Sequence, residues 1–464
     1  MSGALENDVR LTDQDAYPLG DYGNAQRLLA MHGDNIRFCE PLDRWFVWDG
    51  HRFEPDAQSK VARLMHEVLL QLVTQAAAAR DEIATKFAYR SLNRRPIENA
   101  IKVAGTLEQL SILPEQLDQN PYLLNFLNGT VDLRTGELRP HRREDLITKL
   151  IHFNYAPAAR CDLFLKFLAR SVGHGAVLHL QTILGYALVG VTTEKMIFFF
   201  LGPRDVGKTT LLTLYGQKLI PEYAGALRME TIMSHEMTPN VLSDLADLRG
   251  KRFVNTSEVE EYGRLNVGLL KRLCQGRGTI KANHKCKDGV VFPETYTIFI
   301  DTNYTPVVKE TGDADWSRLK VVQFGATVPK KERIEASELE AEAEGVLAWA
   351  VAGAVRWCRE GLGELPEEWN LAQETWREDM NFFAHYLQNR CVVNERCSSL
   401  LRPLFRAYEE EAKAAGERYP LKEMAFAIKL RELGFKPKNV NKGTLYLGIG
   451  LRADVEQSHL DIEN

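Results

Sequence analysis

The stretch from Gly202 to Thr209, GPRDVGKT, constrains the fold of this chain more than any other segment. It fits the pattern G-x-x-x-x-G-K-[ST], follows the apolar run MIFFFL and precedes a segment with a helical pattern. A strand, a glycine-rich turn and a helix in this order let main-chain N–H groups turn inward around phosphate oxygens. The sequence therefore predicts a phosphate-binding loop at the end of a buried strand.

Two side chains of this loop are expected to act on a bound nucleotide. Lys208 would bind the β and γ phosphates, and the hydroxyl of Thr209 would be a ligand of Mg²⁺. We therefore predict that the chain binds ATP and Mg²⁺. The residues expected to line the nucleotide site are Gly202, Pro203, Arg204, Asp205, Val206, Gly207, Lys208, Thr209 and Thr210.

Around the loop, short apolar runs alternate with helical patterns, and four runs are predicted strands: MIFFFLG, KRFVNTSE, TYTIFIDTN and KVVQFG. This alternation is typical of a parallel sheet covered by helices, so the fold class is α/β. A small mixed α/β domain is expected before the ATPase core, and a helical C-terminal domain after it. The expected boundaries are 1–21 for a flexible N-terminus, 22–160 for the mixed domain, 161–335 for the ATPase and 336–464 for the C-terminal domain.

A P-loop ATPase needs a carboxylate near the end of a second strand, to hold Mg²⁺ through water and to polarise the attacking water. Glu258 stands where the apolar run of residues 253–257 ends, and it is the first choice for this catalytic and metal-binding role. Glu260 and Glu261 follow so closely that either could replace it. They could also be solvated glutamates at the start of a helix.

Two further polar residues are candidates for the ATPase site. Asn303 ends the run TYTIFIDTN, where an amide between the acid strand and the P-loop strand could orient water; alternatively, it begins a turn. Arg318 precedes KVVQF and could reach the nucleotide of a neighbouring subunit as an arginine finger. An ion pair with Asp313 or Asp315 is the alternative for Arg318.

The basic segment IKANHKCKDGVVF predicts a β-hairpin whose tip carries His284, Lys285 and Lys287. Lysines and a histidine suit contact with a phosphate backbone, and such a contact is independent of the base sequence. A charged turn can also be merely solvated. Because the segment lies between two ATPase motifs, we predict that these three residues bind DNA.

A helix followed by Gly434 and two strands joined at Lys442-Gly443 is typical of a winged helix. Its basic residues could mark a DNA site or could form a solvated face. They are Lys422, Lys429, Arg431, Lys436, Lys438 and Lys442.

The 464 residues carry a formal net charge of -5, so contact with DNA has to come from local basic patches. The seven cysteines are scattered without a CxxC pair, which favours reduced thiols over a zinc site. No run approaches the roughly 20 apolar residues that a membrane span needs, and the start of the chain is unlike a signal peptide. We expect a cytoplasmic protein with no membrane partner.

The order of these motifs resembles that of the superfamily 3 helicases, in the group of phage, plasmid and poxvirus primase-helicases. The stretches that carry the resemblance are GPRDVGKTT, GKRFVNTSEVEE with RLNVGLLKRLCQG, IKANHKCKDGVVF, TIFIDTN and DWSRLKVVQF. WFVWDGHRF, LLNFLNGTVDLRTGELRPH and LGYALVG look like the domain that precedes the ATPase in that group.

The resemblance implies an AAA+-type core, a hexameric ring with ATP sites between subunits, and a channel hairpin that pulls DNA, usually with 3′ to 5′ polarity. By position it assigns phosphate and Mg²⁺ binding to Lys208 and Thr209, the acidic motif to Glu258, the sensor to Asn303, the finger to Arg318, and the channel hairpin to Lys285 and Lys287.

We therefore expect an ATP-dependent replicative DNA helicase of a phage, prophage or plasmid, working in a bacterial host cell on single-stranded and forked DNA. About twenty residues precede the first helical pattern, too few for a primase module. Either a separate primase or other replication protein is therefore an expected partner, or the chain is a fragment of a longer primase-helicase. The alternative function is an origin-binding initiator ATPase without processive unwinding.

Overall fold

The computed structural model of the chain describes residues 9–233, 237–256, 265–276, 278–283, 289–308, 312–325, 329, 333–380, 382–415 and 420–452. The chain divides into two compact units. The first is Met1–Pro306 with Glu310–Trp369, and the second is Val307–Lys309 with Asn370–Asn464.

The first unit begins with four helices and a three-stranded antiparallel sheet. The helical pattern of residues 57–89 breaks near Arg80, whose φ is 55°, and Asp81 starts the next helix by accepting a hydrogen bond from the N–H of Ala84 (2.9 Å). The helices are α1 (Asp21–His32), α2 (Lys60–Ala78), α3 (Glu82–Ser91) and α4 (Arg94–Ala104), and the strands are β1 (Ile36–Cys39), β2 (Arg44–Trp48) and β3 (Phe53–Pro55).

A second antiparallel sheet lies between these helices and the ATPase core in the sequence. The turn at Asn128-Gly129 requires glycine, because a Cβ on Gly129, at φ 151°, would lie 2.5 Å from the carbonyl oxygen of Arg139. The strands are β4 (Leu123–Phe126), β5 (Gly129–Asp132) and β6 (Glu137–Arg139), and the helices that follow are α5 (Asp162–Val172) and α6 (Val177–Tyr186).

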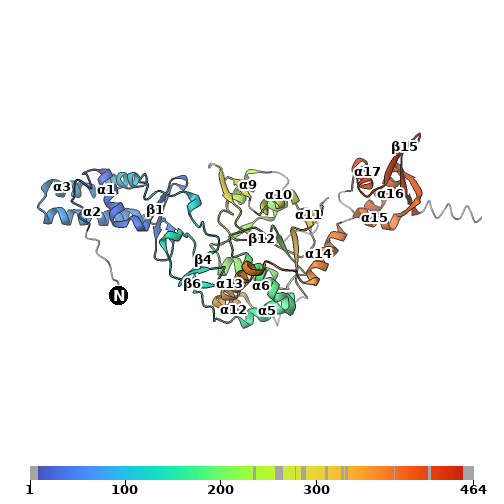
Figure 1. Ribbon diagram of the computed structural model, residues 1–464, viewed down its shortest axis with the longest axis horizontal. Helices are drawn as coiled ribbons and strands as arrows, with labels where there is room; N and C mark the ends of the chain where they lie inside the picture. The colour runs from blue at the N-terminus through green and yellow to red at the C-terminus, as the bar shows by residue number, and fades with distance from the viewer. Residues whose placement is uncertain are drawn as a thin grey trace, which may run out of the picture. The chain divides into compact units, whose positions relative to one another are not determined.

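The predicted ATPase core contains a five-stranded parallel sheet with the order β13-β7-β12-β9-β8 (Figure 1). The predicted α/β fold with a parallel sheet is therefore confirmed. All four predicted strands are present, while β8, which has the sequence AGAL, was not predicted. The strands are β7 (Ile197–Leu201), β8 (Ala224–Leu227), β9 (Phe253–Thr256), β12 (Thr297–Thr302) and β13 (Leu319–Gln323).

Aromatic side chains fill the centre of this sheet. Phe198, Phe199 and Phe200 of β7 are buried, and the ring of Phe299 stacks on the rings of Phe198 (5.5 Å between centroids) and Phe253 (4.7 Å). These contacts hold β7 between its neighbours, so the loop that follows β7 starts from a rigid strand.

Helices cover the sheet, and Figure 1 shows α5, α6 and α13 together on one side of it. The helix α7 (Lys208–Leu212) continues into a π-helical segment, η6 (Thr213–Leu219). The remaining helices of the core are α8 (Met229–Met233), α9 (Pro239–Ala246), α10 (Val267–Leu273), α11 (Asp313–Trp316), α12 (Ala336–Glu340) and α13 (Ala343–Glu360).

The C-terminal domain does not begin at residue 336, as the sequence suggested, because α12 and α13 belong to the first unit. Helix α13 packs very closely on α6. A Cβ on Gly185 would lie 2.1 Å from the N atom of Ala354, and one on Gly353 would lie 2.1 Å from the carbonyl oxygen of Gln181. The glycines that permit this approach make α13 part of the ATPase core.

The second unit has a small aromatic core around Tyr386, Tyr408, Phe426 and Tyr446. Its three strands form an antiparallel sheet with the order β14-β16-β15, and the predicted helix and two-stranded hairpin near the C-terminus are present. The elements are α14 (Glu367–Asp379), which starts in the first unit, α15 (Phe382–Arg390), β14 (Cys391–Leu400), α16 (Leu401–Ala414), α17 (Glu423–Glu432), β15 (Lys436–Val440) and β16 (Gly443–Leu451).

Among the residues that the structure describes, no helix combines the length and the apolar character needed to cross a membrane.

Candidate nucleotide site and hairpin

The loop from Gly202 to Gly207 needs glycine at both ends. A Cβ on Gly202 would lie 2.8 Å from the carbonyl oxygen of Phe324, and one on Gly207 would lie 2.7 Å from the ring of Phe167. Gly207 also has a φ of 95°, which places it in the left-handed region. Glycine is therefore required on steric grounds at both positions of the sequence motif. Gly207 is also the N-cap residue of α7.

Lys208 lies inside this loop, with only 4% of its side chain exposed. Its Nζ donates hydrogen bonds to the carbonyl oxygens of Gly202 (2.8 Å) and Pro203 (2.8 Å) and to Oδ1 of Asn303 (2.9 Å). The structure thus brings Asn303 to the loop, as the strand order predicted. The ammonium group binds oxygen atoms in the region where the motif would hold phosphate oxygens.

Other loop residues are open to solvent. Pro203, Arg204, Asp205 and Thr209 are exposed, whereas Val206 is buried. Asp205 forms an ion pair with Arg333 (2.8 Å), which reaches the loop from just before α12. A nucleotide could therefore approach the loop from solvent without displacing the core.

Asp301 is not among the candidates predicted from the sequence, although it is a charged residue inside the apolar strand β12. Its Oδ2 accepts a hydrogen bond from Oγ1 of Thr209 (2.5 Å), and its Oδ1 is 3.9 Å from Nζ of Lys208. Asp301 comes this close because β12 pairs with β7 in the sheet. Only 4% of its side chain is exposed.

This arrangement fits a bound Mg²⁺. Since the hydroxyl of Thr209 donates a hydrogen bond to Asp301, the lone pairs of the Thr209 oxygen are available to face a cation. Mg²⁺ usually keeps several waters and takes few ligands from the protein, so a hydroxyl supported by one carboxylate is an adequate protein contribution.

We predict that Asp301→Asn weakens the dependence of the site on Mg²⁺. The amide oxygen still accepts from Thr209, so only the negative charge is lost. The Mg²⁺ concentration for half-maximal ATP hydrolysis should rise by about 10-fold or more, as for other groups that support a metal ligand. A Mg²⁺ titration of the ATPase rate and of nucleotide binding measures this, with the exposed Asp313→Asn as control. An unchanged titration would exclude the role for Asp301.

The acidic candidates Glu258, Glu260 and Glu261 lie outside the described residues, so the choice among them stays a prediction. The strand before them, β9, ends at Thr256 and pairs with β12. Since the strands are parallel, β9 ends at the same edge of the sheet as the loop, with β12 between them. The expected placement of Asn303 between the acid strand and the P-loop strand is therefore present.

Arg318 lies at the opposite edge of the sheet. Its carbonyl oxygen accepts a hydrogen bond from the N–H of Ile197 (2.8 Å), at the start of β7. Its guanidinium donates to the carbonyl oxygen of Cys274 (3.0 Å), and Asp315 pairs instead with Lys271 (2.5 Å). The five residues of β7 span about 16 Å at about 3.3 Å per residue, so Arg318 does not belong to the P-loop site of its own chain.

The predicted hairpin is confirmed by β10 (Thr279–Ala282) and β11 (Val290–Pro293), which pair antiparallel with Ala282 opposite Val290. His284, Lys285 and Lys287 lie outside the residues that the structure describes. Because β11 leads directly into β12, the base of the hairpin lies at the same edge of the sheet as Arg318.

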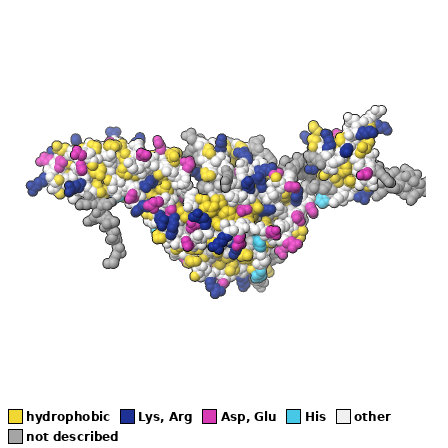
Figure 2. Space-filling view, in the orientation of Figure 1, with side chains coloured by type: hydrophobic (Ala, Val, Ile, Leu, Met, Phe, Trp, Pro, Cys, Tyr) yellow, Lys and Arg dark blue, Asp and Glu magenta, His cyan; other side chains and the backbone are white. Residues whose placement is uncertain are grey.

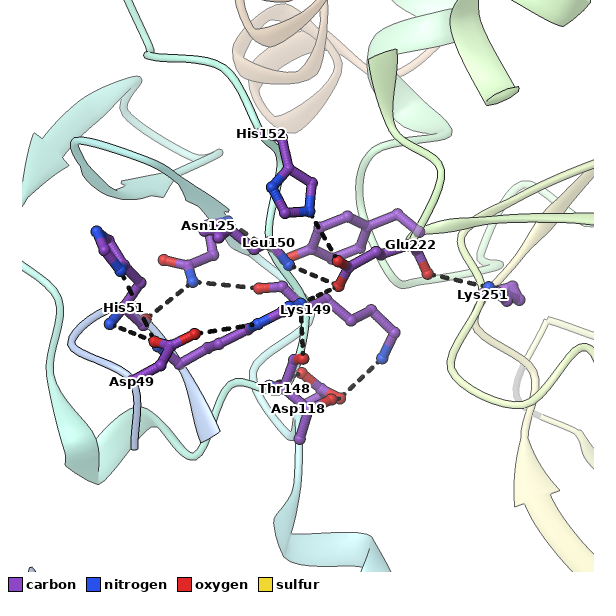
Figure 3. A network of polar contacts seen from close by, with 12 residues as sticks. Asp49, His51, Asp118, Asn125, Thr148, Lys149, Leu150, His152, Glu222 and Lys251 are labelled. Carbon is purple, nitrogen blue, oxygen red and sulfur yellow. Dashed lines mark hydrogen bonds and ion pairs between the residues drawn. The ribbon is translucent and has the colours of Figure 1, made fainter. Parts of the chain in front are cut away.

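A polar network joins the N-terminal part of the first unit to the ATPase core (Figure 3). Glu222, which follows η6, accepts hydrogen bonds from the N–H of Leu150 (3.0 Å) and from Nε2 of His152 (3.0 Å), and it pairs with Arg52. Its carbonyl oxygen accepts from Nζ of Lys251 (3.1 Å). Since η6 continues the P-loop helix, the preceding domain is tied to the nucleotide loop through one helical segment.

The half-buried carboxyl group of Asp118 lies in the same network (Figure 3). Burial by itself would raise its pKa, but the charge of Lys149 (2.7 Å from Oδ2) and hydrogen bonds from Lys149 and Thr148 outweigh burial and lower it. Asp118 therefore stays charged at neutral pH, and it anchors the segment that carries Leu150 and His152 to Glu222.

Comparison with known proteins shows where this chain has relatives. Residues 25–173 match the family described as D5 N terminal like. "Putative helicase L207/L206" of Acanthamoeba polyphaga mimivirus is 25% identical over 305 residues, which cover 60% of this chain and 32% of that protein. "Primase D5" of Fowlpox virus is 28% identical over 253 residues, which cover 50% of this chain and 30% of that protein.

"Putative primase C962R" of African swine fever virus is 26% identical over 232 residues, which cover 47% of this chain and 24% of that protein. The chain thus spans a third or less of the length of these three relatives. All three are viral, so the expectation of a phage or plasmid in a bacterial host gains no support here and stays a prediction, as does the separate primase.

The fold also has a counterpart among solved structures. "The A form apo structure of NrS-1 C terminal region-CTR" matches with a TM-score of 0.51 at 14% identity, over 89% of this chain and 96% of that chain. This likeness concerns the fold alone. The D5 N terminal like domain and the viral relatives named as helicases and primases confirm the resemblance of this chain to the superfamily 3 helicases of the primase-helicase group.

Proposed function

We propose that the chain is an ATP-dependent replicative DNA helicase that moves along single-stranded DNA as a hexameric ring, with 3′ to 5′ polarity. The observation that carries the proposal is the division of the candidate residues between two edges of one sheet. Lys208, Thr209 and Asn303 lie at one edge, and Arg318 lies at the other, about the length of a strand away. A chain with this arrangement holds half of an ATP site at each edge, and a neighbouring copy would complete it.

In this proposal ATP binds at the loop between Gly202 and Gly207. The phosphates replace the carbonyl oxygens that now bind Nζ of Lys208, and the ammonium then stabilises the charge that develops on them during hydrolysis. Thr209, whose hydroxyl Asp301 orients, would hold Mg²⁺, and the ion would supply neutralisation of the phosphate charge. Asn303 is already within hydrogen-bonding distance of Lys208 and positions the attacking water, which Glu258 polarises.

The hairpin gives the proposal a test on DNA. We predict that the double variant Lys285→Ala/Lys287→Ala loses stimulation of its ATPase by single-stranded DNA and no longer separates forked duplexes. For binding to single strands, the negative slope of log affinity against log salt concentration should become shallower by about 1.4 per engaged hairpin. The reason is that each phosphate contact contributes about −0.7 to the slope, and the variant loses two. Stopped-flow unwinding and salt-titrated anisotropy measure both effects.

Lys86→Ala/Lys102→Ala, which removes two exposed lysines of α3 and α4, is the matched control and should keep both properties. A hairpin variant that unwinds forked DNA normally would show that the assignment of His284, Lys285 and Lys287 is wrong. A wild-type chain whose ATPase ignores single-stranded DNA, and which separates no strands, would remove the helicase proposal itself.

The second unit favours one alternative function, an initiator that binds an origin sequence. Residues 420–452 carry seven Lys or Arg and two Glu, whereas the whole chain has a net charge of -5. All five residues of β15 are exposed, and Figure 2 shows Lys and Arg side chains where this unit carries β15. A basic exposed hairpin next to α17 is what a winged helix presents to duplex DNA.

Footprinting on candidate origin DNA separates the two functions. Protection of one particular sequence that disappears in Lys436→Ala/Lys438→Ala would support the initiator, because both lysines stand on the exposed strand β15. Protection without sequence preference, together with unwinding of forked DNA, would favour the helicase.

A further inference from the structure

Glu294 stands between the hairpin and the sheet, one residue after β11 ends. Only 5% of it is exposed. Its Oε2 accepts hydrogen bonds from the N–H groups of Gln275 (2.9 Å) and Gly276 (3.1 Å), and its own N–H donates to the carbonyl oxygen of Gly278 (3.1 Å). One buried residue thus holds both the start and the end of the segment that joins α10 to β10.

Arg318 contacts the same segment from the other side. Its guanidinium donates to the carbonyl oxygen of Cys274 (3.0 Å). Burial raises the pKa of the Cys274 thiol to about 11, so that thiol is neutral at pH 7 and does not act as a charged partner of Arg318. Arg318 therefore binds the base of the hairpin through a main-chain oxygen that no side-chain substitution at Cys274 removes.

Glu294 and Arg318 also interact through their charges. Burial raises the pKa of Glu294, while hydrogen bonds from the main chain and the positive charge of Arg318 act in the opposite direction. When Arg318 moves away, the carboxylate loses the influence of that positive charge, and main-chain hydrogen bonds at Gln275, Gly276 and Gly278 still act to lower its pKa.

Within this segment, Gly276 packs closely against the side chain of Lys195. Gly276 has a φ of 92°, and a Cβ on it would lie 2.6 Å from Cε of Lys195. Lys195 itself has a φ of 57° and precedes β7. Thr279, where β10 and the hairpin begin, lies five residues after Cys274, so we expect a displacement at Cys274 to reach the hairpin.

We propose that Glu294 is a positioning residue that makes Arg318 and the base of the β10–β11 hairpin move together. When Arg318 leaves Cys274 to reach the nucleotide of a neighbouring subunit, the segment that Glu294 holds is released on one side, and the hairpin changes position. The inference rests on the proposed function, in which Arg318 acts on a neighbour and the hairpin contacts DNA.

Cleavage of the full chain by trypsin after Lys285 and Lys287 tests this link. The measured quantity is the ratio of cleavage rates with and without a non-hydrolysable ATP analogue, followed by mass spectrometry. The wild-type ratio should differ from unity several-fold, and Glu294→Ala should bring it to unity. A residue with a merely structural role would change both rates alike and leave the ratio as it was.

Two further variants sharpen the test. Glu294→Gln keeps the volume and one acceptor oxygen but loses the charge, so its ratio should lie between the wild-type value and unity even if Glu294→Ala fails to fold. Arg318→Ala should also give unity, and combining it with Glu294→Ala should change nothing more, because both act through one contact. Glu340→Ala, on a 40% exposed side chain paired with Lys218, is the control and should keep the wild-type ratio.

A wild-type ratio of unity overturns the inference, as does a folded Glu294→Gln or Glu294→Ala chain that keeps the wild-type ratio. Additive effects in the double variant overturn it as well. DNA-stimulated hydrolysis and unwinding by the wild type are measured in parallel. If these are absent, the proposed function fails; if they are present while Glu294 has no effect on the ratio, only the inference about Glu294 fails.

Discussion

Lys208→Ala is expected to abolish ATP hydrolysis. In the structure the ammonium group is buried inside the loop and binds three oxygen atoms, from Gly202, Pro203 and Asn303. These bonds hold Nζ where the phosphates of a nucleotide would arrive. The variant removes the positive charge from that place, while the loop glycines and β7 remain.

The expected size of the effect follows from the chemistry. Loss of one preorganised donor from a site of charge development costs about 10²- to 10³-fold in kcat. A factor of about 10³ corresponds to about 4 kcal/mol of barrier, which brings a slow ATPase below detection. The variant also removes a positive charge that lies 3.9 Å from Oδ1 of Asp301, whose side chain is only 4% exposed, so some loss of thermal stability accompanies the loss of activity.

Phosphate release at saturating ATP and Mg²⁺ measures the prediction, and thermal unfolding shows that the variant is folded. Lys218→Ala is the matched control, because Lys218 lies on η6, in the continuation of the same helix, with half of its side chain exposed. It should hydrolyse ATP at the wild-type rate. A folded Lys208→Ala chain with wild-type turnover would show that the loop is not the ATPase site.

Arg318→Ala is expected to cause the second large loss, about 10³-fold or more in kcat, as for other arginine fingers. The reason is positional. Arg318 precedes β13 at the edge of the sheet opposite the loop, so it can serve only the nucleotide of another copy. Binding of ATP to the variant should remain, because the loop that binds the phosphates is intact.

Mixing the two inactive variants tests whether Arg318 acts on a neighbour. In a ring made from equal amounts of Lys208→Ala and Arg318→Ala subunits, about a quarter of the interfaces combine an intact loop with an intact arginine. ATP hydrolysis should therefore return on mixing, although neither variant is active alone. Native mass measurements on the same mixture confirm that both chains enter one ring.

No return of activity in verified mixed rings would contradict action on a neighbour. Lys208→Ala mixed with a chain that carries both substitutions is the control, because none of its interfaces has an intact loop. It should stay inactive at every mixing ratio.

Much of the fold could be predicted from the sequence because the signals are local. The loop motif needs only the residues from Gly202 to Thr209, and the strand before it is marked by a continuous apolar run. The hairpin β10–β11 is likewise marked by two β-like runs around a charged turn. The sequence did not predict β8, because its residues, AGAL, are small and give no strand pattern. It also misplaced the start of the C-terminal domain, because that boundary depends on the packing of α13 on α6.

The candidate site could be predicted only in part. Asn303 could be placed near the loop because it ends a strand. The role of Asp301 could not be predicted, because the function of a charged residue inside an apolar strand depends on the residue that it contacts. That residue, Thr209, lies 92 residues away along the chain. Sheet pairing between β12 and β7 brings the two together.

The sequence by itself determined the nucleotide loop, the α/β class and the order of the motifs, because each is written in a few adjacent residues. Only the tertiary structure decided which edge of the sheet each candidate occupies: Asp301 beside Thr209 at one edge, and Arg318 with Glu294 at the other. The physical reason is that parallel strands all run the same way, so residues that follow their strands gather at one edge of the sheet and residues that precede their strands gather at the opposite edge.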